Sequence, residues 1–341
     1  MTSISVVIPV RNGRRTILEC IEALKASGPW DELIVVDDAS DDDSAKIAEG
    51  AGARVVRCGS RTGPAGARNR GAAEASSDVI LFVDADVVVP RGTGERLRAA
   101  FADPAIAAVQ TVYTARCPAK NLVSRYQNFY YYYAFARIRE ERIAAFATWC
   151  AAIRREVFMS AGGFNDRIPD PTVEDEELGY ALADAGLSIL LEKDLQVTHL
   201  ASYDLPAFVR RRFRMARAQA KSAWRSVKTR LLLRYVNLRE TGTHHSRLVV
   251  LAILAMLAGE ASLVLLAATR DLGAASVAAT LMAACAVPVA LACCSPFLGA
   301  CVNSLGIKSL PAFAILCLLD TIVLGWGVLF GSIEYLTGSR Y

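Results

Sequence analysis

Residues 79–89 read VILFVDADVVV, an apolar run of strand-forming residues that is interrupted by Asp84-Ala85-Asp86. A continuous β-branched run is typical of a buried strand in a parallel sheet. Two carboxylates at the end of such a strand are costly unless a cation meets them. Alternation along the strand lets Asp84 and Asp86 lean to one side, where a hard divalent cation could share them with substrate phosphates. The alternative is a solvated turn between two strands.

The composition of the chain changes near residue 248. The 341 residues are 53% hydrophobic, but residues 1–247 carry most of the charge and residues 248–341 consist of long apolar runs. We therefore expect a boundary there. The opening strand-like segment, ISVVIPV, is too short for a signal peptide, so we expect the first domain to stay in the cytoplasm. The nine cysteines show no zinc-binding spacing and are expected to be reduced.

The first part of the chain alternates strands with helices. Before the run at residue 79, strands are expected at Ser3–Val10, Glu32–Val36 and Arg54–Arg57, with a helix after each. This order is typical of an α/β fold with a doubly wound parallel sheet. In such sheets ligands bind beyond the carboxyl ends of the strands. Four acidic residues lie at such ends: Asp37, Asp38, Asp84 and Asp86.

Three segments together carry a resemblance to a known family. SVVIPVRNG (5–13), VVDDAS (35–40) and GPAGARNRGAAEASSDVILFVDAD (63–86) resemble the nucleotide-binding half of family 2 glycosyltransferases of the GT-A fold, over roughly the first 215 residues. The resemblance implies a Rossmann-like GT-A domain, expected at residues 1–205, that binds a nucleotide sugar. Arg11 stands where the family usually has an aromatic residue.

The resemblance also implies roles for matching residues at the nucleotide. The loop after the first strand would flank the base and ribose, through Pro9, Val10 and Asn12. Asp38 would hydrogen-bond a uracil-type base, Arg68 would lie against the nucleotide, and Asp84 would hold the ribose or a metal-bound water. An alternative for Arg68 is a solvated cation at a helix start.

Two further residues are implied as metal ligands. Asp86 would ligate the Mg²⁺ or Mn²⁺ that bridges the diphosphate, and this metal would offset charge on the departing nucleoside diphosphate. His199 follows an expected strand, where a histidine is commonly structural. In the family a histidine at this place often completes the metal shell.

The segment Glu174-Asp175-Glu176-Glu177 opens an expected helix, where acidic residues commonly complement the helix dipole. In the family, GGF followed by an acidic pair supplies the general base, which implies Asp175, with Glu174 in reserve. One base without a covalent intermediate would invert the anomeric centre. The diphosphate and acceptor are expected near Arg212, Arg214, Gly163 and Trp149.

Aromatic and basic residues point to a surface beside the membrane. Four consecutive tyrosines, Tyr130 to Tyr133, cannot all face a core, so they are expected at an acceptor or at the bilayer. Residues 206–239 contain eleven Arg or Lys and no acid. Such a segment suits nucleic acid or anionic lipid. The apolar tail that follows favours the membrane, so residues 206–247 are expected to form basic interfacial helices.

The apolar part, residues 248–341, is expected to hold about three transmembrane helices. Spans are expected at Leu248–Thr269, Leu272–Ala292 and Leu310–Ile333. Residues 293–305 form a loop, a re-entrant piece or the end of the second span. The basic segment before the first span places that end of the span in the cytoplasm. Three spans would then put Tyr341 outside, whereas two spans would return it to the cytoplasmic side. Two acids within the spans are functional candidates, expected here as oligomer contacts: Glu260 and Asp320.

These expectations define a multi-pass protein of the cell inner membrane with a cytoplasmic, metal-dependent glycosyltransferase domain. The donor is expected to be a UDP-sugar, and the acceptor a hydroxyl on a lipid or lipid-linked glycan. Nucleic acid is not expected as a partner, whereas a homo-oligomer is possible. The alternatives are a polyprenyl-phosphate acceptor, which needs no general base, a non-catalytic scaffold, and a nucleotidyltransferase.

Overall fold

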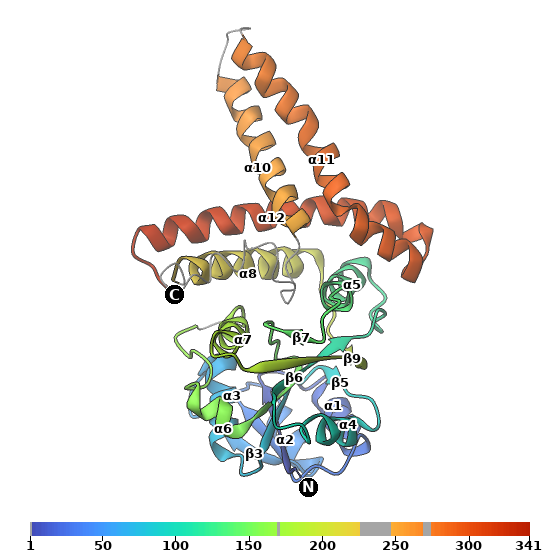
Figure 1. Ribbon diagram of the computed structural model, residues 1–341, viewed down its shortest axis with the longest axis vertical. Helices are drawn as coiled ribbons and strands as arrows, with labels where there is room; N and C mark the ends of the chain where they lie inside the picture. Colours follow the sequence, from blue (N-terminus) through green and yellow to red (C-terminus); the bar gives the residue numbers. More distant parts are fainter. Residues whose placement is uncertain (1, 169–170, 226–246, 269–273) are drawn as a thin grey trace.

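The computed structural model describes residues 2–168, 171–225, 247–268 and 274–341. A sheet domain with helices on both faces lies at the N-terminal end, and long helices lie at the other (Figure 1). Part of the expected basic segment, residues 226–246, lies outside the described residues, as do the expected span boundaries at Thr269 and Leu272.

Four parallel strands form the first half of the sheet, in the order β3-β2-β1-β4. They match the expected segments: β1 (Ile4–Val10), β2 (Glu32–Asp37), β3 (Arg54–Arg57) and β4 (Val79–Val83). The helices between them are α1 (Ile17–Ala26), α2 (Ser44–Gly50) and α3 (Gly63–Glu74). Helix α3 lies close to β1 at Gly71, which has no side chain. A Cβ added there would come within 2.3 Å of a Val7 methyl. Every residue of β4 is buried, as a strand covered on both faces requires.

The second half of the sheet differs from the expected parallel arrangement. β8 (Cys150–Arg154) inserts antiparallel between β4 and β6 (Ile106–Tyr113). One long strand, β9 (Ser188–His199), runs parallel to β6, with a register irregularity between Thr111 and Val112. The sheet is therefore mixed. Shorter elements complete the domain: β5 (Val87–Val88), α4 (Thr93–Ala100), β7 (Arg142–Ile143), α6 (Arg155–Ser160) and α7 (Glu174–Asp184).

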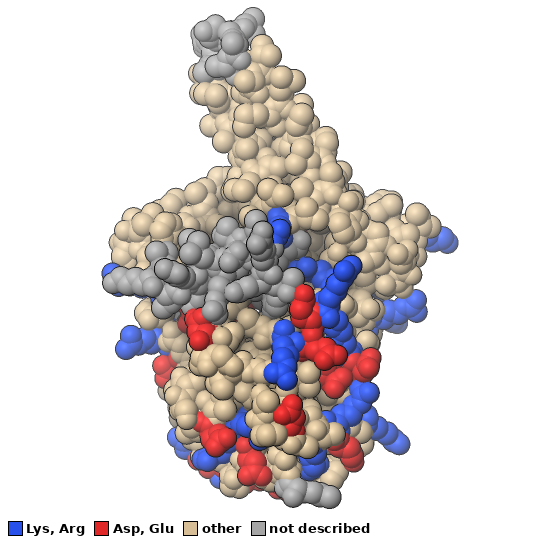
Figure 2. Space-filling model, viewed as in Figure 1, with Lys and Arg blue, Asp and Glu red and all other residues tan. Residues whose placement is uncertain are grey.

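Three long apolar helices follow, and each is long enough to cross a membrane. They are α10 (Arg247–Ala268), α11 (Ala274–Leu305) and α12 (Leu310–Leu336). Residues 293–305, left open by the sequence, continue α11 as helix. The α10–α11 hairpin stands away from the sheet domain, and its visible face bears almost no charged side chain (Figure 2). Large apolar side chains such as Leu263 and Leu281 are exposed there, as contact with lipid requires.

Helix α12 lies along α8 (Leu205–Arg225) and across the base of the hairpin (Figure 1). The two helices are joined by a buried, bidentate ion pair. Arg212 Nε lies 2.6 Å from Asp320 Oδ1, and Arg212 Nη2 lies 2.8 Å from Oδ2. Asp320 is therefore paired with Arg212 of the same chain, whereas from the sequence it is expected at an oligomer contact. Glu260 on α10 has a buried Oε2 with no hydrogen-bond partner in the described part of the chain.

Helix α5 (Leu122–Ala136) joins the sheet domain to the apolar helices. Its Tyr126 packs edge-on against Phe297 of α11 and Phe313 of α12, and its hydroxyl donates to Asp320. Tyr131, by contrast, points to the sheet domain and contacts Trp149. The run of four tyrosines divides in the same way, because Tyr133 contacts Phe297 of α11 while Tyr131 contacts Trp149.

Candidate active site

A cleft of about 1020 Å³ opens beyond the carboxyl ends of β1, β2 and β4. This large cleft lies where ligands bind in sheets of this kind. All six residues expected at the nucleotide and one expected at the metal line it: Pro9, Val10, Asn12, Asp38, Arg68, Asp84 and Asp86. Its volume is at the upper end of the roughly 300–1,000 Å³ that hold organic ligands.

The β1 loop at the cleft is braced against the loop after β2. Asn12 takes a left-handed backbone conformation (φ 55°), which asparagine tolerates better than most residues. Its N–H donates to Ser40 Oγ at 3.0 Å, and its side-chain oxygen accepts from Asp41 N at 2.8 Å. These two bonds fix the rim of the cleft before any ligand arrives.

Asp38 holds the start of α3 in place. Its carboxylate accepts from Thr62 N at 2.5 Å, from Thr62 Oγ1 at 2.8 Å and from Gly63 N at 3.0 Å. A carboxylate at a helix start is stabilised by the free N–H groups there. Asp38 thus has an architectural role in addition to the base contact expected for it.

Arg68 occupies the centre of the site and is buried. Its Nη2 lies 2.7 Å from Asp84 Oδ1, and its Nη1 lies 3.0 Å from Glu174 Oε1. The planar guanidinium suits this bridging of two carboxylates. Burial raises the pKa of the Asp84 carboxyl despite the opposing charge of Arg68. Arg68 is therefore not a solvated cation but the link between the strand-end acids and α7.

Asp86 and His199 meet because β5 pairs antiparallel with β9, with Val87 opposite His199. His199 Nε2 lies 3.4 Å from Asp86 Oδ2. His199 is buried and stacks on Tyr113, with 4.9 Å between the ring centroids. Although burial opposes it, the bond to His199 holds the pKa of Asp86 below its usual range.

The pair of Asp86 and His199 fits part of a Mg²⁺ or Mn²⁺ site. One carboxylate oxygen and one imidazole nitrogen converge on a single point beside the large cleft. Within the described residues no group of three His, Cys, Asp or Glu side chains is placed to hold a metal. Mg²⁺ commonly takes only one or two carboxylates and draws its other ligands from substrate phosphates and water. Two protein ligands beside a diphosphate-sized cleft agree with that pattern.

Asp175 lies in a smaller cavity, the inner pocket, which adjoins the large cleft. Arg68, Asp84, Pro171 and Arg211 line both. Asp175 Oδ2 accepts from Thr148 N at 3.0 Å and from Thr148 Oγ1 at 3.2 Å. Burial, followed by the nearby charge of Glu174, raises the pKa of Asp175 to about 7. A carboxyl with this pKa can take and release a proton near neutrality.

The inner pocket has an aromatic wall. Trp149 stacks on Tyr113 with 4.6 Å between centroids, and Tyr131 and Phe135 of α5 contact the Trp149 ring edge-on. Trp149 is thus at the expected acceptor part of the site. An apolar wall in a cavity that also holds a carboxylate suits a ligand with one apolar face and one polar end.

Gly163 supports the site without lining either cavity. Its φ of 74° is left-handed, and an added Cβ would lie 2.7 Å from Asn69 Oδ1. The same Asn69 oxygen accepts from Phe164 N at 2.9 Å, and Asn69 Nδ2 donates to Phe164 O at 2.8 Å. This loop is therefore fixed to α3 at the residue next to Arg68.

The basic residues of α8 separate by the direction in which they point. Arg212, expected near the diphosphate, faces α12 and Asp320 instead. Its neighbour Arg211 lines both the large cleft and the inner pocket and lies 5.7 Å from the Tyr203 ring. Burial lowers the pKa of Arg211, but the surrounding acidic groups, Tyr203 first and then others that include Asp86, raise it overall. Arg214 lines a separate cavity further along α8.

The periodicity of α8 is the sequence signal that could have pointed to Arg211, rather than Arg212, as the arginine at the cavities. Phe208, Arg212, Ala216 and Ala220 are all buried and recur at every fourth residue. This stripe is the packed face of the helix. Arg211 lies about 100° from Arg212 around the axis, since an α-helix has 3.6 residues per turn.

Comparison with known proteins agrees with this geometry. Residues 5–162 match the family profile described as glycosyl transferase family 2. These residues form a family 2 glycosyltransferase domain. The chain is 30% identical over 207 residues to the pre-mycofactocin glycosyltransferase of Mycobacterium tuberculosis, a match that covers 58% of this chain and 42% of that protein. It is 37% identical over 90 residues to the succinoglycan biosynthesis protein ExoU of Rhizobium meliloti, covering 25% and 26%. The chain thus spans less than half of the length of these relatives.

The family 2 domain and the helices after it together resemble one solved structure. This is a mannosyltransferase from Pyrobaculum calidifontis in complex with GDP-Man and Mn²⁺. The TM-score is 0.56 at 18% identity, and the alignment covers 98% of this chain and 87% of the mannosyltransferase. At this identity the likeness is one of fold, and it extends from the GT-A-like sheet into the apolar helices.

Proposed function

We propose that this protein is a membrane-anchored, metal-dependent, inverting glycosyltransferase. It moves a sugar from a nucleotide sugar, expected to be a UDP-sugar, to a hydroxyl of a lipid or lipid-linked glycan. The observation that carries the proposal is the pair of adjoining cavities: one of donor size beside Asp86 and His199, and one that holds Asp175. Both the family profile and the fold of the mannosyltransferase support the reaction class.

Asp175 is proposed as the general base. Its oxygens accept hydrogen bonds from Thr148 N and from Glu176 N, which fix the plane of the carboxylate. Each carboxylate oxygen can accept two bonds, so a lone pair is left for the acceptor hydroxyl. The hydroxyl oxygen would give its proton to Asp175 as it attacks the anomeric carbon from the inner pocket. One displacement of this kind inverts the anomeric centre.

Charge on the departing nucleoside diphosphate would be met by cations of the chain. Arg211 lines both cavities and so would lie between donor and acceptor. Fixed positive groups aimed at developing charge are a principal source of catalysis. Asp86 and His199 would hold Mg²⁺ or Mn²⁺, which supplies further positive charge at the diphosphate when bound. Arg68 would keep Asp84 and Glu174 in place.

The membrane location of the reaction is proposed from the apolar helices. Arg211 and Met215 of α8 line the inner pocket, and α8 lies along α12 (Figure 1), so the inner pocket lies near the apolar part of the molecule. This position supports the proposal of a multi-pass location in the cell inner membrane and a lipid-bound acceptor, and the basic segment supports a sheet domain in the cytoplasm. A homo-oligomer stays a prediction.

The proposal can be tested with the full chain in lipid nanodiscs. Nucleotide sugars with Mn²⁺ should raise the unfolding temperature, because ligand binding at 100 times the Kd stabilises by about 2.7 kcal/mol. The stabilising donor should then yield nucleoside diphosphate when lipid acceptors are supplied, and Asp86→Ala should abolish this yield. No stabilisation by any nucleotide sugar would instead favour a scaffold. Release of inorganic diphosphate would identify a nucleotidyltransferase.

A further inference from the structure

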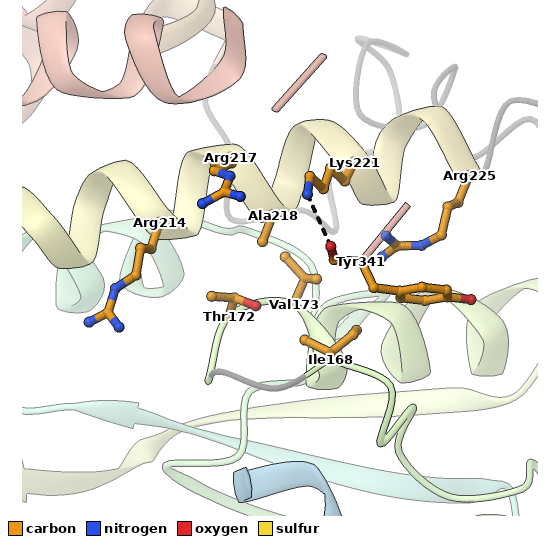
Figure 3. A pocket seen from close by; sticks show the side chains of 9 residues that line it. All are labelled: Ile168, Thr172, Val173, Arg214, Arg217, Ala218, Lys221, Arg225 and Tyr341. Atoms are coloured by element: carbon orange, nitrogen blue, oxygen red, sulfur yellow. Dashed lines mark hydrogen bonds between the residues drawn. The ribbon is translucent and has the colours of Figure 1, made fainter. Parts of the chain in front are cut away.

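A third cavity, the cationic pocket, lies between α8 and the loop that leads into α7 (Figure 3). Its volume is about 130 Å³. That is well below the roughly 300–1,000 Å³ of pockets that hold whole organic ligands. The cavity therefore suits one small group of a larger molecule.

Four cations from one side of α8 line the cavity: Arg214, Arg217, Lys221 and Arg225. They recur at three- and four-residue spacings, so they share a face of the helix. Among the described residues no acidic side chain lines the pocket. Like charges at this spacing repel one another unless an anion is present.

Part of this charge is balanced from outside the cavity. Oε2 of Glu334, on α12, lies 2.5 Å from Arg217 Nε and 2.9 Å from Lys221 Nζ. Arg225 forms an ion pair with Glu177 of α7. These contacts hold the side chains of Arg217, Lys221 and Arg225 in place, and Figure 3 shows a further hydrogen bond from Lys221 to the Tyr341 carbonyl. Placing them in advance lowers the cost of ordering them when a ligand binds.

The position of the cationic pocket connects it to the inner pocket. Thr172 lines both cavities. Along the chain, Thr172 lies only three residues before Asp175. On α8, Met215 lines the inner pocket and its neighbour Arg214 lines the cationic pocket. A molecule held among the cations would therefore reach towards the proposed base past Thr172.

We propose that the cationic pocket binds a phosphate group carried by the acceptor. This inference rests on the proposed function, because it names the chemistry of the second substrate. A phosphate offers several acceptor oxygens and up to two negative charges, which forked guanidinium groups bind in a bidentate manner. The pocket lies between α8 and the loop that leads into α7, so a phosphate held there would leave the hydroxyl of the acceptor towards Asp175.

Binding can be measured without sugar transfer. The full chain in detergent is titrated by calorimetry with dioctanoyl phosphatidic acid, with glycerol 3-phosphate and with dioctanoylglycerol. Both phosphates are expected to bind and the uncharged lipid is not. Binding of the phosphatidic acid alone would also support the proposal and would assign the phosphate to a lipid headgroup, whereas binding of both would admit a soluble phosphate ester.

Variants locate the site. Arg214→Gln should weaken phosphate binding by about tenfold or more, the effect of losing a charge-assisted hydrogen bond. Ala218→Glu places a carboxylate in the same cavity and should abolish binding, while Arg210→Gln removes an exposed charge of α8 outside the cavity and should leave it unchanged. Asp86→Ala should stop sugar transfer but keep phosphate binding, which separates this inference from the proposed function. Binding that is equal in wild type, Arg214→Gln and Ala218→Glu would overturn the inference, as would the absence of binding by both phosphates.

Discussion

Arg68 on α3 donates a 3.0 Å hydrogen bond to Glu174 at the start of α7, 106 residues further along the chain. Both side chains are almost fully buried. The same guanidinium holds Asp84 at the end of β4. One cation therefore sets the distance between the donor side of the site and the helix that carries Asp175.

Replacing this cation should destabilise the domain. Arg68→Met leaves the buried Glu174 without its cation, with one hydrogen bond from Thr172 N remaining, and removal of one member of a buried ion pair typically costs about 3–5 kcal/mol. Thermal unfolding of the full chain in detergent would measure the loss. Arg70→Met removes an exposed cation two residues away on the same helix and should change stability by no more than about 0.5 kcal/mol. Equal losses in the two variants would contradict the central position of Arg68.

The rate of transfer should depend on the protonation of Asp175. Only the carboxylate form can accept a proton, so kcat/KM should rise with pH through about 7, the pKa that burial gives this group. Asp175→Asn should remove transfer and keep donor binding, which a nucleotide-sugar titration would show.

Stability provides the control for this prediction. The folded protein holds the Asp175 proton more tightly than the unfolded chain does, so the stability contributed by this group is lost as pH rises through about 7. Asn carries no charge and still accepts from Thr148 N. Asp175→Asn should therefore unfold at no lower a temperature than wild type at pH 8, and a large drop there would indicate a structural role.

Metal binding should depend on His199 as well as Asp86. Loss of either ligand should weaken Mn²⁺ binding in the presence of nucleoside diphosphate by at least about tenfold. Electron paramagnetic resonance of free Mn²⁺ gives this affinity directly. Asp43→Asn, which alters an exposed carboxylate of α2, serves as the control. Unchanged affinity in His199→Ala would leave the histidine with a packing role against Tyr113.

The ion pair between α8 and α12 should be more important to stability than its surface counterpart. Asp320→Ala strands the buried Arg212 and should cost about 3–5 kcal/mol, whereas Arg212→Met with Asp320→Leu should recover most of that loss. Glu334→Gln weakens a pair with the partly exposed Arg217 and another with the buried Lys221, but it keeps a side chain that can accept hydrogen bonds, so it should cost less than Asp320→Ala. Thermal unfolding of the four proteins would rank them, and a Glu334→Gln effect as large as that of Asp320→Ala would argue against the buried pair.

The two ends of the described chain should lie on the same side of the membrane. Lys221 Nζ donates to the carbonyl of Tyr341 at 3.0 Å, and Arg225 lies over the Tyr341 ring, so the end of α12 returns to α8. Epitope tags at both ends should show equal protection from protease in intact spheroplasts and equal cleavage in inverted vesicles. Opposite behaviour of the two tags would require α12 to cross the bilayer.

The sequence predicts the first half of the fold well because that half depends on local patterns. Strands β1, β2 and β4 contain apolar runs, helices separate the four strands, and the acidic ends of β2 and β4 lie at one edge in any parallel sheet. The position of β8 is different. Its residues, CAAIR, are short and mostly small, and only pairing with β4 and β6 reveals that this strand runs antiparallel.

The site residues that belong to sequence motifs could be predicted, whereas those whose direction depends on the packing of helices could not. The Asp84-x-Asp86 strand end and the Glu174-Asp175 helix start lie at adjoining cavities, as expected from their motifs. The choice between Arg211 and Arg212 depends on which face of α8 meets α12. That contact joins residues 108 positions apart, and its partner, Asp320, reads in sequence only as an isolated acid within an apolar run.

The connection from β9 to α8 limits where sugar can be added. His199 is the last residue of β9 and Leu205 is the first of α8, so only residues 200–204 separate the proposed metal ligand from the helix that lies along α12. So short a tether holds the reaction centre at a constant height above the lipid headgroups. The enzyme would then select acceptors by their distance from the membrane, because only hydroxyls at that height would reach the reaction centre.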